Sequence, residues 1–372
     1  MKSILGAIIF IILFSCQDKK NNKDAQFKYV KNMTFDSGFK SGNAQIEFIN
    51  GKEFLCIGEY QKEKRIALHP LDGKESIFID ISRLDLFNER VLAFEILSLD
   101  TILVLPYYSN ILYCMNQKGD VWKTIDLNPY LEKEGRFELK RSATPFHYNN
   151  NSLIFSLEYL MDTEIAYDVY DYRKKRNAAP ILLKIEDIFE DTLDVQFGLR
   201  NLYNHFSDAN HANIEGNNFA FINDQIVFNT AYSDSLYIID PDHLRIKQKI
   251  KISSDYSRIY IDPIANKQQA QNPNLVNQNF TTNGQIRSVK YDNDEKVYLV
   301  FVSHKPKELR TSWSVIILDN DFNKIDEYLM DDSKYAYYGL ISSKGLLISN
   351  YYETLRDVAT YDKNTYALYD FE

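Results

Sequence analysis

The chain has 372 residues, of which 45% are hydrophobic and 26% are charged, a composition that is ordinary for a folded globular protein. Its 27 Tyr and 23 Phe residues favour β-strands. The formal net charge is −9 and becomes −10 if residues 1–15 are removed with Lys2. This acidic balance argues against nucleic acid as a partner.

The N-terminal residues have the pattern of a secretory leader. Lys2 is followed by an apolar run over residues 4–14, which is too short to cross a bilayer of about 30 Å as a helix. Such a run is typical of a signal-peptide core. Residues 13–15, Leu-Phe-Ser, then lead directly into Cys16. This resembles the lipobox of bacterial lipoproteins, in which cleavage precedes the cysteine and the thiol receives diacylglycerol.

We therefore predict a lipoprotein signal peptide over residues 1–15, lipidation at Cys16 and a solvated, lipidated tether over 16–26, where apolar periodicity is absent. Gln17 rather than Asp follows the cysteine, which favours delivery to the outer membrane, facing the periplasm or the cell surface. The alternative is a short buried helix with a free cysteine. The partner implied by the lipobox is the membrane itself, through the lipid anchor on Cys16.

Two further cysteines, Cys56 and Cys114, lie inside apolar, strand-like runs. Buried free thiols are favoured there over a disulfide framework. No cysteine and histidine spacing typical of zinc is present, and we expect no cofactor.

A length of 372 would usually indicate two or more domains, but an internal repeat changes this expectation. Each unit begins with two strands joined by a turn, and these first hairpins lie at residues 43–60, 91–108, 143–159, 213–232, 286–303 and 335–352. A second hairpin follows, with Gly, Asn, Asp or Pro in its turn, at residues 65–81, 111–127, 165–188, 235–252, 314–330 and 358–372. The unit at 165–188 has a longer turn.

Four strands repeated six times predict an all-β fold, a six-bladed β-propeller of four-stranded antiparallel blades over residues 27–372. Each blade buries its faces against its neighbours, so that no unit needs to be stable alone. The segment FKYVKNMTF, residues 27–35, is a further strand that fits the outer edge of the last blade, where YALYDF, residues 366–371, competes with it.

The lipobox, the short tether, the six four-stranded repeats and a composition rich in Lys, Asn, Ile and Tyr together resemble the TolB-like six-bladed β-propeller lipoproteins of Bacteroidetes. The resemblance covers essentially the whole chain. It implies the fold and the lipid anchor, but it carries no active-site residues across.

The repeat spacing indicates where function concentrates. The third and fourth units are the longest, and their excess falls mainly in the blade-to-blade links, around 190–212 and 254–285. These links and those between second and third strands emerge on one end of a propeller, so both insertions crowd one face. Residues 266–285 have the composition of a mobile flap, although a surface loop without a role is the alternative.

Tyrosines recur at the ends of the second strands, on the same face. Tyr offers a flat apolar ring and a hydroxyl, which suits sugars, peptides and protein interfaces, but packing between blades is the alternative. The residues are Tyr60, Tyr107, Tyr108, Tyr159, Tyr232, Tyr351 and Tyr352, with His304 near the equivalent place in blade five.

First strands line the channel of a propeller, and their entrances carry basic or imidazole side chains. We hypothesise that these groups form an anion-tolerant binding site with the nearby flap, whereas ordinary solvated charges are the alternative. The residues are Arg90, Arg141, His211, Arg287 and Lys334.

Signals for catalysis are few. His205, Asp208 and His211 lie close in sequence, but no strand or helix spacing makes them converge on a metal. The carboxylates of Glu47, Glu95 and Glu215 lie in first strands and would meet in the channel if the register is right, as in metal-dependent propeller lactonases. No residue is therefore assigned as catalytic or metal-ligating.

Two functions remain open. The first is a non-enzymatic binding or scaffold module at the cell envelope, which recruits a protein, peptide or glycan on its loop-rich face. The second is a metal-assisted hydrolase or lyase that acts in the channel. Fold alone does not distinguish between them, but the lack of a catalytic signature favours the first.

Overall fold

The structure is a computed structural model. It describes residues 27–36, 44–59, 64–84, 91–106, 109–135, 137–139, 146–149, 151–159, 178–200, 218–222, 225–230, 233–260, 283–304, 312–330, 339–349 and 363–371.

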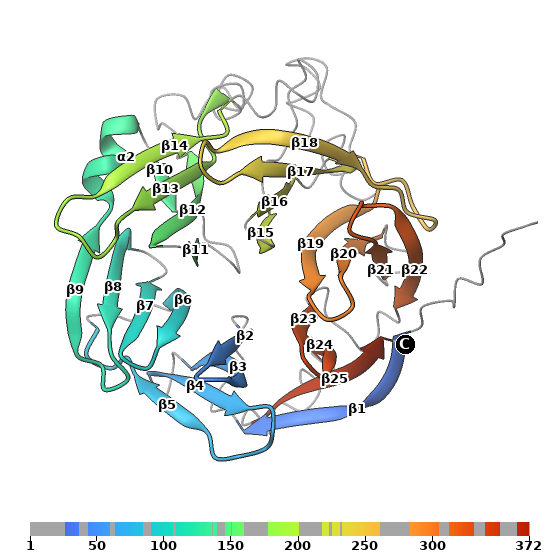
Figure 1. The fold of residues 1–372 in the computed structure, drawn as a ribbon, viewed down its shortest axis with the longest axis horizontal. Coiled ribbons are helices and arrows are strands. Elements are labelled where there is room, and N and C mark those ends of the chain that lie inside the picture. The colour runs from blue at the N-terminus through green and yellow to red at the C-terminus, as the bar shows by residue number, and fades with distance from the viewer. Residues whose placement is uncertain are drawn as a thin grey trace, which may run out of the picture.

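Six antiparallel sheets stand around a central axis as the blades of a propeller, which confirms the predicted fold (Figure 1). Blade one contains β2 (Ala44–Ile49), β3 (Lys52–Glu59), β4 (Arg65–Pro70) and β5 (Ile77–Asp80); blade two contains β6 (Val91–Ser98), β7 (Thr101–Pro106), β8 (Ile111–Met115) and β9 (Val121–Asp126); blade three contains β11 (Phe146–Asn149), β12 (Ser152–Tyr159), β13 (Leu182–Glu186) and β14 (Asp194–Gly198). Blade four contains β15 (Asn218–Ile222), β16 (Gln225–Asn229), β17 (Ser235–Asp240) and β18 (Arg245–Lys251); blade five contains β19 (Gln285–Asp292), β20 (Val297–Ser303), β21 (Trp313–Leu318) and β22 (Lys324–Met330); blade six contains β23 (Gly339–Ser342), β24 (Gly345–Ser349), β25 (Lys363–Phe371) and β1 (Phe27–Asp36).

The two ends of the described chain meet in blade six and close the ring. The order of this sheet is β1-β25-β24-β23, and β1 pairs antiparallel with β25, with Met33 opposite Tyr366. The outer position predicted for residues 27–35 is confirmed. The prediction of a hairpin of third and fourth strands at 358–372 is wrong, because β25 is the third strand and its free edge is taken by β1.

Blade three also differs from its prediction. Its third strand is β13, a segment expected to be the fourth strand, and its fourth is β14, a segment expected to lie in a blade-to-blade link. A short extra strand, β10 (Phe137–Leu139), pairs with the end of β12, and the helix α2 (Asn128–Glu134) precedes it. Neither element was predicted from the sequence. The error arose because the Tyr-rich residues 165–172 have strand composition, and these residues lie outside the described ranges.

The core is divided into six apolar clusters, each between two neighbouring blades. Strand β7 shows the principle: Ile102 and Val104 pack toward blade one, whereas Leu103 and Leu105 pack toward blade three. Successive side chains of a strand point to opposite faces of its sheet. Middle strands buried on both faces therefore read as continuous apolar runs rather than as alternating ones.

The cluster between blades six and one closes the ring. Phe35 from β1 and Leu347 and Leu368 from blade six pack with Leu55 and Ile57 from blade one. A fully buried side chain of this size contributes about 1.5–3 kcal/mol. The N-terminal strand therefore adds to the core as well as to the hydrogen-bonded edge.

The hairpin turns carry the residues that their backbone angles require. Between β2 and β3, Asn50 and Gly51 have φ angles of 50° and 74°, the pair of positive values that favours Asn-Gly in a two-residue turn. Gly345 opens β24 with φ of 117°, and a Cβ atom there would collide with the carbonyl oxygen of Tyr369. These turns set the register of the strands that follow.

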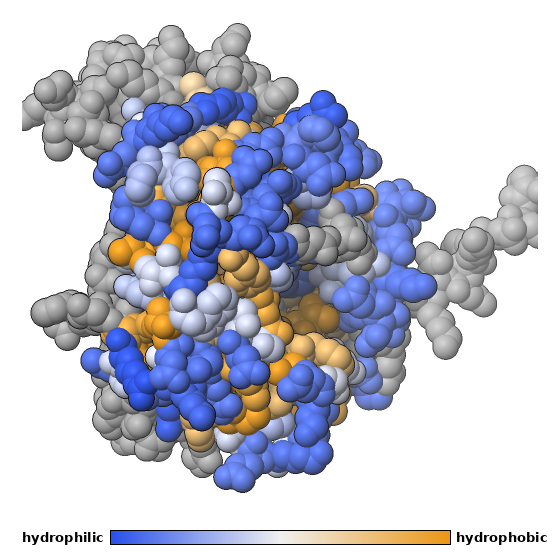
Figure 2. All heavy atoms as spheres, turned by 60° about the vertical axis from the view of Figure 1, so that its left-hand side comes forward, coloured by the Kyte–Doolittle hydropathy of each residue, from blue (hydrophilic) through white to orange (hydrophobic). Residues whose placement is uncertain are grey.

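The outer face is mixed in polarity. Figure 2 brings the β9 side forward and shows hydrophilic side chains over much of the described surface, with hydrophobic ones between them. Cys56 and Cys114 are buried free thiols, as predicted. Among the described residues, no helix is long and apolar enough to span a membrane.

Candidate functional site

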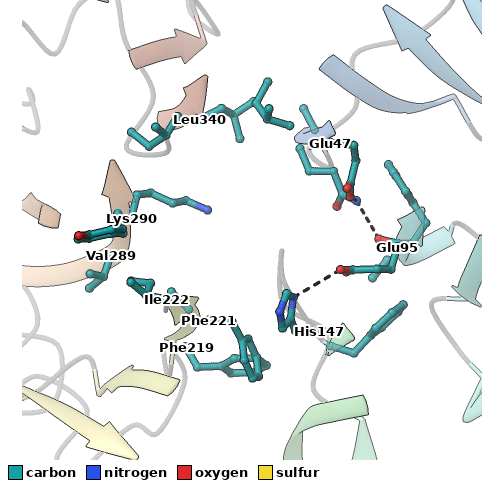
Figure 3. A pocket seen from close by; sticks show the side chains of 18 of the residues that line it. Glu47, Glu95, His147, Phe219, Phe221, Ile222, Val289, Lys290 and Leu340 are labelled. Carbon is teal, nitrogen blue, oxygen red and sulfur yellow. Dashed lines mark hydrogen bonds and ion pairs between the residues drawn. The ribbon is translucent and has the colours of Figure 1, made fainter. Parts of the chain in front are cut away.

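The six innermost strands surround a cavity at the centre of the ring. It has a volume of about 410 Å³, and residues of β2, β6, β11, β15, β19 and β23 line it (Figure 3). This confirms the prediction that first strands line the channel. The volume lies within the range of about 300–1,000 Å³ that small-ligand pockets occupy.

One wall of the channel is acidic. Glu47 on β2 and Glu95 on β6 both point into it. Gln45 bridges the two strands, because its Nε2 donates to Oε1 of Glu47 (2.5 Å) and to the carbonyl oxygen of Phe94 (2.9 Å). The backbone N–H of Tyr148 donates to the Glu95 carboxyl. The approach of Glu47 to Glu95 that was predicted from the sequence is observed. Glu215 lies outside the described residues.

Burial changes the protonation of this pair. Desolvation raises the pKa of Glu47 from 4.5 to about 7, although the hydrogen bond from Gln45 opposes the change. Desolvation, and next the charge of Glu47, raise the pKa of Glu95 well above its usual value. Two carboxylates so close and so poorly hydrated do not both ionise at neutral pH. Burial therefore favours protonation of the acidic wall near neutral pH.

His147 on β11 lies beside the acidic pair. Its Nδ1 is 3.5 Å from Oε1 of Glu95, and its ring stacks on Phe221 with a centroid distance of 4.1 Å. Burial lowers the pKa of His147 to about 4. The imidazole is thus neutral at neutral pH, and it contributes a flat, weakly polar surface rather than a charge.

The opposite wall carries one base. Lys290 on β19 extends into the channel across from the acidic pair (Figure 3). Within the described part of the chain, its ammonium group makes no hydrogen bond or ion pair. Burial lowers the pKa of Lys290. Apolar side chains, including Phe219, Ile222 and Leu340, occupy the remaining wall.

A metal site is not evident among the described residues, where no three His, Cys, Asp or Glu side chains are grouped to hold an ion. The loop trio considered from the sequence, His205, Asp208 and His211, lies outside the described ranges. The channel instead offers two hydrogen-bonding walls of opposite charge character and an apolar side.

Of the basic residues predicted to ring the channel entrance, the structure describes Arg287. Arg287 is the extra residue of an irregularity in the register of β19 with β20, and its Nε donates to Oγ of Ser303 (2.8 Å). Such bulges redirect a side chain relative to regular pairing. The other members of the ring, Arg90, Arg141, His211 and Lys334, lie outside the described residues. The anion-binding hypothesis stays a prediction.

The tyrosines of the loop-rich face are likewise described at one position. Tyr159 ends β12 and is partly buried, with its ring edge-on to Phe137 at 5.4 Å. This contact is a cross-strand pair within blade three, because Phe137 lies opposite Tyr159 in the pairing of β10 with β12, and both rings pack against the cluster between blades two and three. The other tyrosines, Tyr60, Tyr107, Tyr108, Tyr232, Tyr351 and Tyr352, lie outside the described residues.

A polar chain in blade five was not anticipated from the sequence. His304 follows β20 and is buried; its Nδ1 lies 2.6 Å from Oγ of Ser257, and its Nε2 lies 2.8 Å from Oγ of Ser314. Ser314 donates to Oε1 of Glu327 (2.6 Å). Because the Ser314 proton goes to a carboxylate, Nε2–H of His304 donates to Ser314, and Nδ1 accepts from Ser257.

Glu327 anchors the segment that leaves blade four. It accepts hydrogen bonds from Oγ of Ser254 (2.6 Å) and the backbone N–H of Asp255 (2.7 Å), and it pairs with Lys324 (2.8 Å). Burial opposes its charge, but the hydrogen bonds from Lys324, Ser254 and Ser314 outweigh burial and lower the pKa of Glu327. The residues come from separate strands and a link, so sequence spacing contained no signal for this network.

Comparisons with known proteins agree with this architecture. The family model described as "Domain of unknown function (DUF4221)" matches residues 89–329, which is more than half of the chain. A search of curated proteins found no match.

Two solved structures resemble the whole chain. A member of the DUF4221 family from Bacteroides vulgatus is 17% identical, with a TM-score of 0.69 over 94% of this chain and 99% of that one. A putative exported protein from Bacteroides fragilis is 10% identical, with a TM-score of 0.55 over 96% of this chain and 98% of that one. At these identities the likeness concerns the fold.

Proposed function

The chain belongs to the DUF4221 family, and we propose that it is a non-enzymatic binding propeller of the cell envelope, which recruits a protein, peptide or glycan across its loop-rich face and receives part of that ligand in the central channel. One observation carries the proposal: an acidic pair faces, across a cavity of ligand size, a lysine that has no partner among the described residues.

The cost of burying charge supports this role. Desolvating charged groups costs free energy unless they find partners. A purely structural role for the channel does not explain why Glu47, Glu95 and Lys290 occupy these positions. Ligand pockets, in contrast, combine an apolar lining with a few convergent polar groups. The channel has both features.

The test compares capture by channel and surface variants. The protein would be immobilised and exposed to solubilised envelope from its native organism. We expect Lys290→Glu to lose the ligand that the wild type retains, whereas Lys118→Glu, an exposed change in a hairpin turn, retains it. Equal capture by all three proteins would exclude the channel as the binding site. Circular dichroism confirms that each variant is folded.

The predicted basic ring is tested separately, since it lies on other residues. Reversing the charge at Arg141 and Arg287 together should weaken capture if these groups contribute to binding. Unchanged capture by this double variant would leave the loop-rich face without its proposed anion site.

We also propose that Cys16 anchors the protein to the outer membrane. The support is the lipobox-like sequence before it and the likeness to a Bacteroides protein described as putatively exported. Metabolic labelling with a radioactive fatty acid should mark the wild type and leave Cys16→Ser unlabelled. Equal labelling of both proteins would show that the cysteine is not the site of attachment.

A metal-assisted hydrolase or lyase, similar to a lactonase, is the alternative. The approach of Glu47 and Glu95 in the channel favours it, since paired carboxylates are frequent calcium ligands. Calorimetric titration with Ca²⁺ and with Zn²⁺ distinguishes the two functions. Tight metal binding that Glu47→Gln removes would favour the enzyme.

A further inference from the structure

The channel has a polarity that limits which ligands fit it. Glu47 and Glu95 project from neighbouring strands on one side, and Lys290 projects from β19 on the other (Figure 3). No described side chain pairs with Lys290, and no lysine or arginine among the described lining residues pairs with the two carboxyls, where Glu95 contacts only the neutral imidazole of His147 among the basic side chains. The protein thus presents both members of an ion pair and keeps them apart.

The protonation of these groups supports a missing partner on each side. Burial raises the pKa of both glutamates and lowers that of Lys290, so on each wall burial opposes the charged form. An ammonium group at the acidic wall would restore the carboxylate charge, and a carboxylate at Lys290 would restore the ammonium charge. A neutral sugar can hydrogen-bond to both walls but supplies no charge to either of them, and a simple anion or cation supplies the opposite charge to one wall only.

We infer that the channel binds a zwitterion of the amino-acid type, a short peptide or amino acid whose ammonium group lies between Glu47 and Glu95 and whose carboxylate reaches Lys290. This inference rests on the proposed function, because it specifies the ligand of the same channel. Among the proposed partners it selects the peptide class over the glycan class.

The remaining lining fits the body of such a ligand. Phe219, Phe221 and Ile222 of β15 and Leu340 of β23 provide an apolar side, and the neutral ring of His147 stacks on Phe221 within it. An aliphatic or aromatic side chain would find apolar contacts there. The cavity of about 410 Å³ accommodates a dipeptide but not a folded partner.

The test is calorimetric titration of the full-length protein at pH 7 with four probes: the dipeptide Ala-Phe, N-acetyl-Ala-Phe, Ala-Phe amide and N-acetylglucosamine. We expect Ala-Phe to bind and each capped form to bind at least about tenfold more weakly, which corresponds to about 1.4 kcal/mol for each lost charge pair. N-acetylglucosamine should not compete with it.

Variants assign each end of the ligand to its wall. Lys290→Met should bind the dipeptide and its amide equally, because it has lost the group that distinguishes them. The double variant Glu47→Gln with Glu95→Gln should bind the dipeptide and its N-acetyl form equally. Lys118→Met, on the surface, should retain both preferences. These ratios do not depend on overall stability, so a weakened fold cannot produce them.

Two results would overturn the inference. If both capped peptides bind as well as Ala-Phe, the walls do not discriminate between charged and uncharged ends of the peptide. If no dipeptide binds at millimolar concentration, or the sugar binds more tightly, the ligand is of another class. In either case, capture from the envelope that still depends on Lys290 would preserve the channel as the binding site, whereas capture independent of Lys290 would remove the proposed function as well.

Discussion

The acidic pair makes a quantitative prediction about stability. Glu47→Gln keeps the shape of the side chain, and its amide oxygen accepts from Gln45 as the carboxylate oxygen does. The substitution removes the titratable group alone. It therefore isolates the free energy of ionising a carboxyl in the channel.

The magnitude follows from the pKa. A pKa raised from 4.5 to about 7 means that the native protein binds the proton more tightly than the unfolded chain does. The stability linked to this group is fully present below about pH 4.5 and is lost as the pH rises through 7. At most about 3 kcal/mol is lost between pH 4 and pH 8, which is a large part of the 5–15 kcal/mol typical of a domain.

The assay is urea unfolding of the wild type and of Glu47→Gln at pH 4, 6 and 8. We expect the two proteins to differ least at pH 4 and the variant to become the more stable one by pH 8. The substitution also removes the Glu47 charge, which raises the pKa of Glu95. Ionising Glu95 therefore costs less free energy in the variant, which further favours the variant at high pH. Glu132→Gln, an exposed substitution in α2, should follow the wild type at every pH.

Parallel stability curves for the wild type and Glu47→Gln across this range would refute the reasoning. They would mean that water hydrates the carboxyl pair in the native channel as well as it does in the unfolded chain. The proposed electrostatics of the channel would then have no basis.

Three further predictions concern the fold. Gly345→Ala should destabilise the protein by roughly 2 kcal/mol or more, because its Cβ would meet the carbonyl oxygen of Tyr369. Gly51→Ala, with open space around its Cβ, should destabilise it by about 1 kcal/mol. Urea unfolding midpoints compare the two variants, and equal losses of stability would contradict the clash at Gly345. Glu327→Ala should cost roughly 3 kcal/mol, because buried donors lose their acceptor, and a loss below about 1 kcal/mol would show that the network is dispensable. Deleting β1 should lower stability by about 5 kcal/mol, since an edge of β25 is left unpaired, and a truncated protein with an unchanged midpoint would disprove its role in closing the ring.

Local sequence was a good guide wherever a blade is built from consecutive short hairpins. Strands were predicted correctly from the turn at Asn50 and Gly51 and from the apolar runs of β3, β7 and β20. Positive φ angles and burial on both faces of a sheet each restrict the residue types that a position accepts. The guide failed in blade three. There β13, which begins at Leu182, is the third strand, whereas composition alone placed the third strand near residue 165.

The candidate site was visible only in part. Glu47 and Glu95 stand out as carboxyls in first strands, so their approach was foreseeable once a propeller had been predicted. Lys290 and His147 were not selected, although they lie on equivalent strands, because lysine and histidine in a solvated position look the same in sequence as those in a channel. The network from Ser257 to Glu327 joins residues of β21 and β22, the residue that follows β20, and a link, and it had no local signature.

The sequence by itself determined the number of blades, the strands of most of them and the inner position of each first strand, since these depend on periodicity and turn chemistry along the chain. Only the tertiary structure decided that β1 completes blade six, that an acidic pair faces Lys290, and that burial shifts the pKa values of these groups against their charged forms. The reason is physical: strand formation is governed by neighbours in sequence, whereas hydration and the partners of a charge depend on residues that folding brings together from distant parts of the chain.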